Sequence, residues 1–194
     1  MSENELKAVL AILKHPEQRY NAHTLSKELG ISAMGTLKIL KRLEKEGIVR
    51  GENIANARFY RVRIKEVYAR EYAKFALLRE AANAPPQVKR WIQELKKVRY
   101  ADAAILFGSV LRKKDPKDID VLFVTDQKRF KKLQEEIKEL NALTPKAIHP
   151  IFQSYKDLVN NIKKKDVVIL DAIKGIVAFG ADILLEAYYE SHQE

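Results

Sequence analysis

The chain has 194 residues, 46% of them hydrophobic, and a formal net charge of +10 with no cysteine. The lack of cysteine excludes disulfide scaffolds, thiol nucleophiles and cysteine-ligated zinc fingers. No apolar run approaches the ~18–20 residues that cross a bilayer, and the first residues lack the pattern of a signal peptide, so we expect a soluble, cytoplasmic protein with no membrane partner.

The positive charge is confined to the first half of the chain. Residues 1–99 carry 21 basic and 11 acidic side chains, an excess of +10, whereas residues 100–194 carry 15 of each. Such a division predicts two domains with different partners. The basic half favours a polyanion such as DNA, with a solvated basic surface that binds nothing as the alternative.

The N-terminal segment has the pattern of three short helices followed by a β-hairpin. After a first run of apolar residues at helical spacing, Asn21 is a favourable N-cap for a second helix, which Gly30 closes. Ser32 is the expected cap of a third helix. Two short strands then follow at 48–50 and 58–62, around a polar loop.

The phrase LSKELGISAMGTLKILKRLEKEGIV, within Thr24–Val49, resembles the winged helix-turn-helix family of DNA-binding regulators. The likeness implies a positioning helix, a tight turn, a recognition helix and a wing. At about 100 degrees per residue, four cations of the third helix share the face opposite its leucines, and such a helix fits the major groove. The expected DNA contacts are Ser32, Lys38, Lys41, Arg42, Lys45 and, from the wing, Arg58. A merely solvated face, or a protein-interaction module, stays open as an alternative.

A helical linker is expected between the two domains. Apolar spacing without Gly or Pro predicts one long helix over 64–82, and the prolines at 85 and 86 end it and begin the next. Its aromatic residues are expected to pack within the chain or on a second subunit, because regulators that read palindromic DNA are commonly homodimers. The predicted domains are 1–65, a winged helix-turn-helix; 66–86, the linker; and 87–194, a second domain.

Two carboxylates stand at the entrance of a buried strand in this second domain. One apolar run predicts a strand that ends at Gly108-Ser109, and another predicts a strand from Ile119. Because strand side chains alternate, Asp118 and Asp120 project from the same face, about 6.6 Å apart along the chain. Such a pair suits Mg²⁺ or Mn²⁺ shared with phosphate oxygens, which makes a nucleoside triphosphate the expected ligand. Gly108 permits close approach of a phosphate, and Ser109 offers a hydroxyl and an amide.

The stretch ILFGSVLRKKDPKDIDVLFV resembles the minimal nucleotidyltransferases of the DNA polymerase β superfamily. The resemblance implies an α+β chain, in which a small α/β domain with a mixed sheet follows the winged helix. It also implies that Gly108 and Ser109 hold the triphosphate and that Asp118 and Asp120 are catalytic and bind metal. A nucleotidyl group then passes to a hydroxyl-bearing acceptor: a partner protein such as a toxin, a small molecule or a nucleic acid.

The sequence departs from that family at one position, and this departure bears on whether the protein is catalytic. Catalytic members have a third carboxylate on a later strand, but residues 141–156 contain no Asp or Glu, and His149 stands about where that acid is expected. His149 is either a ligand or base, or a structural residue of an edge strand. The sequence therefore predicts a nucleotidyltransferase-like protein, with a non-catalytic, nucleotide-sensing transcriptional regulator as the alternative. The remaining chain is expected to be helical, with a short apolar turn at 176–179.

Overall fold

A computed structural model describes residues 2–191 and has the expected α+β fold. The chain forms two compact units, one up to Leu77 and one from Leu78 onward. Among the described residues, no helix combines the length and the apolar character needed to cross a membrane.

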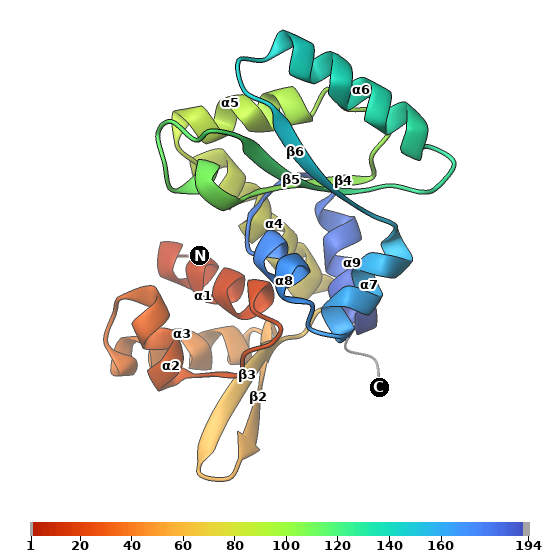
Figure 1. The fold of residues 1–194 in the computed structure, drawn as a ribbon. Helices are drawn as coiled ribbons and strands as arrows, with labels where there is room; N and C mark the ends of the chain where they lie inside the picture. Colours follow the sequence, from red (N-terminus) through yellow and green to blue (C-terminus); the bar gives the residue numbers. More distant parts are fainter. Residues whose placement is uncertain (1, 192–194) are drawn as a thin grey trace. The chain divides into compact units, whose positions relative to one another are not determined.

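The N-terminal unit consists of helices and a small antiparallel sheet with strand order β1-β3-β2. Its elements are α1 (Glu3–Lys14), β1 (Tyr20–Asn21), α2 (Ala22–Leu29), α3 (Ala33–Lys45), β2 (Val49–Ile54) and β3 (Ala57–Val62) (Figure 1). This order is that of a winged helix-turn-helix, with β2 and β3 as the wing.

The helix boundaries follow from local capping, as predicted. The Asn21 side chain accepts a hydrogen bond from the Thr24 backbone N–H at 2.9 Å, which begins α2. Gly30 ends α2 in the left-handed conformation, with φ of 65°. The Ser32 hydroxyl then accepts from the Gly35 N–H at 3.1 Å and begins α3. These three residues fix the tight turn between the two helices.

The wing differs from the expected short strands around a long polar loop. The β2–β3 ladder continues from Val49 opposite Val62 to Ile54 opposite Ala57, so only Ala55 and Asn56 form the turn. Ala55 has a positive φ of 50°, as tight hairpin turns require. Cross-strand pairing therefore extends into residues whose polarity indicated a loop.

The long helix predicted after the wing is present as α4 (Val67–Asn83), and α5 (Pro86–Leu95) begins at the second proline as expected. Five residues of α4 are buried: Ala69, Tyr72, Ala73, Ala76 and Leu77. On the other side of the helix, Tyr68 and Phe75 are exposed.

The C-terminal unit is built on a mixed sheet with strand order β6-β5-β4-β7. Its other elements are β4 (Ala103–Phe107), η1 (Gly108–Leu111), β5 (Ile119–Val124), α6 (Phe130–Leu143), β6 (Ile148–Gln153), α7 (Tyr155–Lys163), α8 (Val167–Ile173), β7 (Ile176–Phe179) and α9 (Ala181–Ser191). Strands β5 and β6 are parallel, because α6 connects them, and the other pairs are antiparallel.

The two faces of this sheet bury different residues. Ile119, Val121 and Phe123 of β5 belong to one hydrophobic core with residues of α5 and α6. Figure 1 shows these two helices on one face of the sheet. Side chains at even positions of β5 therefore face the other side, where α8 and α9 pack against β4. Asp118 and Asp120 share this second face.

The expected apolar turn at 176–179 is instead the strand β7, which pairs antiparallel with β4. Four residues are too few for a periodic signal, and the pairing partner lies far away in the sequence. This prediction was wrong because strand formation here depends on a non-local neighbour.

Candidate functional site

The face of α3 predicted to read DNA is exposed. Leu40 and Leu43 are fully buried, whereas the four cations of the helix, Lys38, Lys41, Arg42 and Lys45, are exposed, as is the cap residue Ser32. Among the described residues, Lys38, Lys41 and Lys45 form no ion pair with a carboxylate. Their charges are therefore available to a polyanion.

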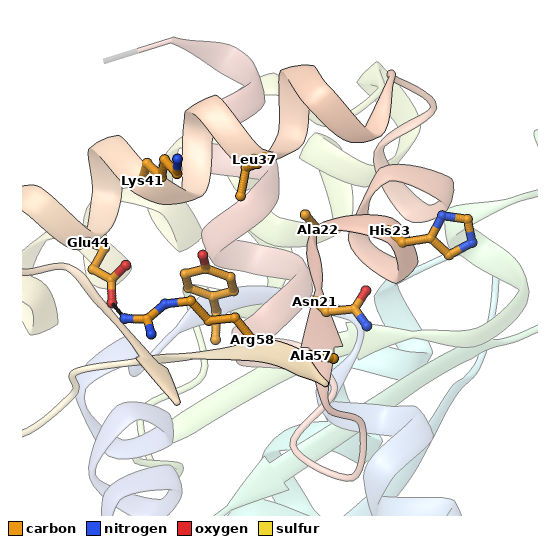
Figure 2. A pocket seen from close by; sticks show the side chains of 9 residues that line it. Asn21, Ala22, His23, Leu37, Lys41, Glu44, Ala57 and Arg58 are labelled. Carbon is orange, nitrogen blue, oxygen red and sulfur yellow. Dashed lines mark hydrogen bonds and ion pairs between the residues drawn. The ribbon is translucent and has the colours of Figure 1, made fainter. Parts of the chain in front are cut away.

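A hollow of about 370 Å³ separates α3 from the wing. Figure 2 shows Lys41 and Glu44 projecting from α3 on one side and Arg58 from β3 on the other. The apolar part of the lining of this hollow comes from Leu37, Ala22 and Ala57. Two predicted DNA contacts, from different elements, thus border the same hollow.

Glu44 connects the recognition helix to the wing. Its Oε1 atom accepts a hydrogen bond from the Arg58 Nη2 at 2.6 Å and another from the Gly51 backbone N–H at 2.9 Å. The bond from Arg58 holds the pKa of Glu44 below its usual range, despite partial burial. Arg58 also donates to Asn53 at 3.0 Å. Its charge is therefore partly compensated inside the unit.

Arg42 has a structural contact that the sequence did not indicate. Its guanidinium pairs with Glu5 of α1, whose side chain is only 3% exposed. Burial opposes the ionisation of Glu5, but hydrogen bonds from Ser2 and the charge of Arg42 outweigh it and lower the Glu5 pKa. Arg42 therefore holds α3 against α1, and its role toward DNA stays a prediction.

Met34 is an exposed residue of α3 that the sequence pattern did not indicate as a DNA contact. Its side chain is 65% exposed, and it lies on α3 at helical spacing with Lys38, Lys41 and Lys45. The N-terminal residues of a recognition helix are those that contact base edges. The signal available in the sequence was a large apolar residue at helical spacing with the three lysines of α3.

In the C-terminal unit, the Gly108–Ser109 turn lies directly against Asp120. Gly108 has a left-handed φ of 74°, and a Cβ at this position would overlap the Asp120 carboxylate. The backbone N–H of Ser109 opposes the rise in the pKa of the Asp120 carboxyl, so this amide acts on the carboxylate. The Ser109 hydroxyl is a further polar group at the turn.

Asp118, Asp120 and His149 form what we call the Asp-Asp-His cluster. Each offers a ligand atom, and these atoms all lie within 4.8 Å of one another. The parallel ladder places His149 of β6 opposite Asp120 of β5, and His149 Nδ1 lies 3.3 Å from Asp118 Oδ2. The structure therefore brings together the two predicted aspartates and the histidine.

Negative charge accumulates at this cluster. Burial and the neighbouring Asp118 raise the pKa of Asp120, against the opposing effects of His149 and the Ser109 N–H. Asp171, on α8, adds further repulsion. This nearby carboxylate comes from a segment in which the sequence indicated no chemistry. Such a concentration of charge, with two hard oxygen donors and an imidazole, fits a divalent metal ion.

A basic loop borders the cluster. Arg112, Lys113, Lys114 and Lys117 are exposed between η1 and β5. The only acid in that stretch before Asp118 is Asp115, and its carboxylate pairs with Lys146. The loop is therefore positively charged next to a negatively charged site.

Comparison with known proteins places most of the chain in one family. Residues 46–178 match the model described as "Family of unknown function (DUF6932)". The chain belongs to this DUF6932 family. Residues 1–50 match a model for a winged helix-turn-helix of DNA-binding type, which confirms the resemblance of the N-terminal domain. No curated protein and no solved structure matches the chain.

The description of the DUF6932 family names no activity. The candidate chemistry of the second domain therefore rests on its residues. In this family member, Gly108, Ser109, Asp118 and Asp120 lie around one end of the β4–β5 pair. The sequence predicted these four residues as one site, with His149 as a possible ligand or base, and the structure places His149 beside the aspartates and adds Asp171 to their surroundings.

Proposed function

We propose that the C-terminal unit binds a nucleoside triphosphate with Mg²⁺ or Mn²⁺ and transfers its nucleotidyl group to a hydroxyl acceptor, while the winged helix binds DNA. In the transfer, the acceptor oxygen forms a bond to the α-phosphorus, the bond from that phosphorus to the oxygen bridging to the β-phosphate breaks, pyrophosphate leaves, and the hydroxyl proton passes to solvent. The observation that carries this proposal is the meeting of the Gly108–Ser109 turn with Asp118 and Asp120 at one end of the sheet. The resemblance to minimal nucleotidyltransferases supports it, because the same residue types occur there in the same order.

Each part of the site has a role in this proposal. Asp118 and Asp120 hold the metal, which neutralises charge on phosphate oxygens during an in-line displacement. Gly108 fixes the position of Asp120, and the Ser109 hydroxyl binds a phosphate oxygen. The exposed cations of the loop attract and orient the triphosphate: Arg112, Lys113, Lys114 and Lys117. The acceptor is a partner protein such as a toxin, a small molecule or a nucleic acid.

One observation favours a second candidate function. Strand β6 has no carboxylate, and His149 lies where catalytic relatives of the proposed class have an acid. A protein that binds nucleotide without turning it over, and regulates DNA binding in response, fits this substitution. The two functions differ in whether a nucleotidyl group is transferred.

The nucleotide site is tested with the double variant Asp118→Asn/Asp120→Asn in the full chain. We expect metal-dependent ATP binding, measured by calorimetry, to weaken at least tenfold, because the metal loses both charged ligands. The matched control is Glu135→Gln/Glu139→Gln, which removes two exposed carboxylates of α6 and is expected to bind as the wild type does. Equal ATP affinity in the aspartate variant contradicts the proposed site.

The two candidate functions are separated with α-labelled nucleotides. The transferase predicts label on an acceptor in cell extract, and loss of that label in the aspartate variant. Clear ATP binding with no transfer from any of the four nucleotides supports the regulator instead.

For the winged helix, we propose that the stripe of Met34, Lys38, Lys41 and Lys45 enters the major groove. The methionine is placed to contact thymine methyl groups, and the lysines to contact phosphates or base edges. Arg58 borders the same surface from the wing.

This proposal is tested by the salt dependence of binding to random-sequence duplex DNA. Each of Lys38→Gln, Lys41→Gln and Lys45→Gln is expected to reduce the slope of log affinity against log salt by about 0.9, because one phosphate contact is lost. Fluorescence anisotropy measures the affinity. Lys131→Gln, an exposed lysine of α6, is the control, and slopes unchanged in all three α3 variants contradict the proposal.

A further inference from the structure

The ligand set of the Asp-Asp-His cluster points to a particular class of metal ion. We propose that His149 is a direct metal ligand and that it makes the site prefer divalent first-row transition metals, for which Mn²⁺ is the paramagnetic probe, over Mg²⁺. The proposal deepens the function given above and rests on it for the location of the metal.

The sheet fixes the histidine beside the two carboxylates. In the parallel β5–β6 ladder, Asp120 lies opposite His149, so the two side chains leave the same face of neighbouring strands. The ladder continues with Val121 opposite Pro150, and β6 is the edge strand, where a residue without an N–H is tolerated. The residues before and after His149 are therefore both paired with β5, which fixes the position of the His149 backbone.

The imidazole is positioned to bind a metal together with its neighbours. His149 Nδ1 lies 3.3 Å from Asp118 Oδ2, and the donor atoms of the three residues fall within 4.8 Å of one another. The His149 side chain is 61% exposed, so no packing hinders rotation of the ring toward an ion. Two oxygen donors at the start of β5 and a nitrogen donor from the neighbouring strand β6 thus converge on one point.

The exchange of a carboxylate for an imidazole affects the two metals differently. Mg²⁺ requires near-octahedral oxygen coordination and binds through carboxylates, phosphates and water. Imidazole nitrogen is a good ligand for first-row transition metals, and affinity for a given site rises along that series from Mn²⁺. A neutral histidine in place of a third acid also removes one negative charge, which weakens the attraction for Mg²⁺ without a compensating bond.

A histidine that only forms an ion pair with Asp118 is the competing explanation of the same geometry. It predicts no nitrogen bond to the metal and no effect of His149 on metal preference. The two explanations therefore differ in a spectroscopic property that does not depend on enzymatic activity.

The test uses the metal-free full chain titrated with Mn²⁺ alone. Electron paramagnetic resonance measures free Mn²⁺, and electron spin echo envelope modulation detects nitrogen bound to the ion. We expect nitrogen modulation in the wild type and at least a tenfold preference for Mn²⁺ over Mg²⁺, measured by competition. In His149→Ala the modulation is lost. In His149→Asp, Mn²⁺ still binds without modulation, and the preference over Mg²⁺ falls at least threefold.

His23→Ala, which removes an exposed histidine of the N-terminal unit, is the matched control and is expected to leave both readouts unchanged. Equal nitrogen modulation in wild type and His149→Ala overturns the inference, as does an unchanged metal preference in His149→Asp. Nitrogen modulation without any nucleotide binding overturns the proposed function alone. ATP binding with Mg²⁺ and no nitrogen modulation overturns the inference alone.

Discussion

The backbone of Gly108 is left-handed, and any side chain at this position meets the Asp120 carboxylate. Gly30 has a similar φ of 65°, but nothing lies within 4 Å of a Cβ added there. A substitution at Gly30 therefore introduces backbone strain alone, whereas a substitution at Gly108 introduces backbone strain and also displaces the Asp120 carboxylate. Both positions favour glycine because of their left-handed backbone. Only at Gly108 would a side chain also collide with a neighbouring group.

We expect Gly30→Ala and Gly108→Ala each to lower the free energy of unfolding by about 1–2 kcal/mol through left-handed strain. Gly108→Ala is also expected to weaken Mn²⁺ binding at least tenfold, because the Asp120 carboxylate has to move. Urea unfolding and Mn²⁺ titration measure the two effects. Mn²⁺ affinity that is the same in both variants contradicts the role given to Gly108.

At the scale of single residues, the sequence predicted the caps and the shared face of the two aspartates correctly because these features depend on near neighbours. Asn21, Gly30 and Ser32 act within four residues of their own positions. The contacts of Arg42 with Glu5 and of Arg58 with Glu44 were not predicted, since periodicity assigns a face to a side chain but not a partner.

Between elements, the pair of Glu5 and Arg42 connects α1 to α3 and makes the N-terminal unit sensitive to acid. The Glu5 pKa is lower in the folded state than its ordinary value of 4.5. The ionised form therefore stabilises the fold above about pH 4.5, and this contribution is lost as the pH falls through the lowered pKa.

The variant Glu5→Gln is expected to cost roughly 1–2 kcal/mol at neutral pH, because a buried charge-assisted hydrogen bond is removed. Its stability is also expected to fall less steeply than that of the wild type below pH 4.5. Urea unfolding followed by circular dichroism across that range measures both. Glu3→Gln, on the exposed side of the same helical turn, is the control. Parallel pH profiles for wild type and Glu5→Gln contradict the assignment.

Sheet elements were harder to predict than helices for a physical reason. A helix is stabilised by bonds and side-chain contacts within a few residues, whereas β7 depends on β4, about 70 residues away, and the far end of β2 depends on pairing across the hairpin with β3. The run Ile176–Phe179 has the composition of a strand but is too short to show alternation.

For the whole molecule, the sequence predicted the winged helix and the α+β layout with a mixed sheet better than the surroundings of the second site. Gly108, Ser109, Asp118 and Asp120 belong to one continuous stretch and were found together. His149 joins them through the parallel β5–β6 pairing, and Asp171 through the packing of α8 on the sheet. The sequence placed His149 about where a third acid is expected, whereas the approach of Asp171 is visible only in the folded chain.

The helix α4 runs without interruption from Val67 to Asn83, and the boundary between the two compact units falls inside it, after Leu77. A boundary inside a helix provides no loop at which the chain is easily divided. A fragment cut at the end of the wing would lose the buried residues of α4 up to Leu77. A DNA-binding fragment suited to expression and crystallisation therefore ends beyond Asn83, where the prolines at 85 and 86 already interrupt the helix.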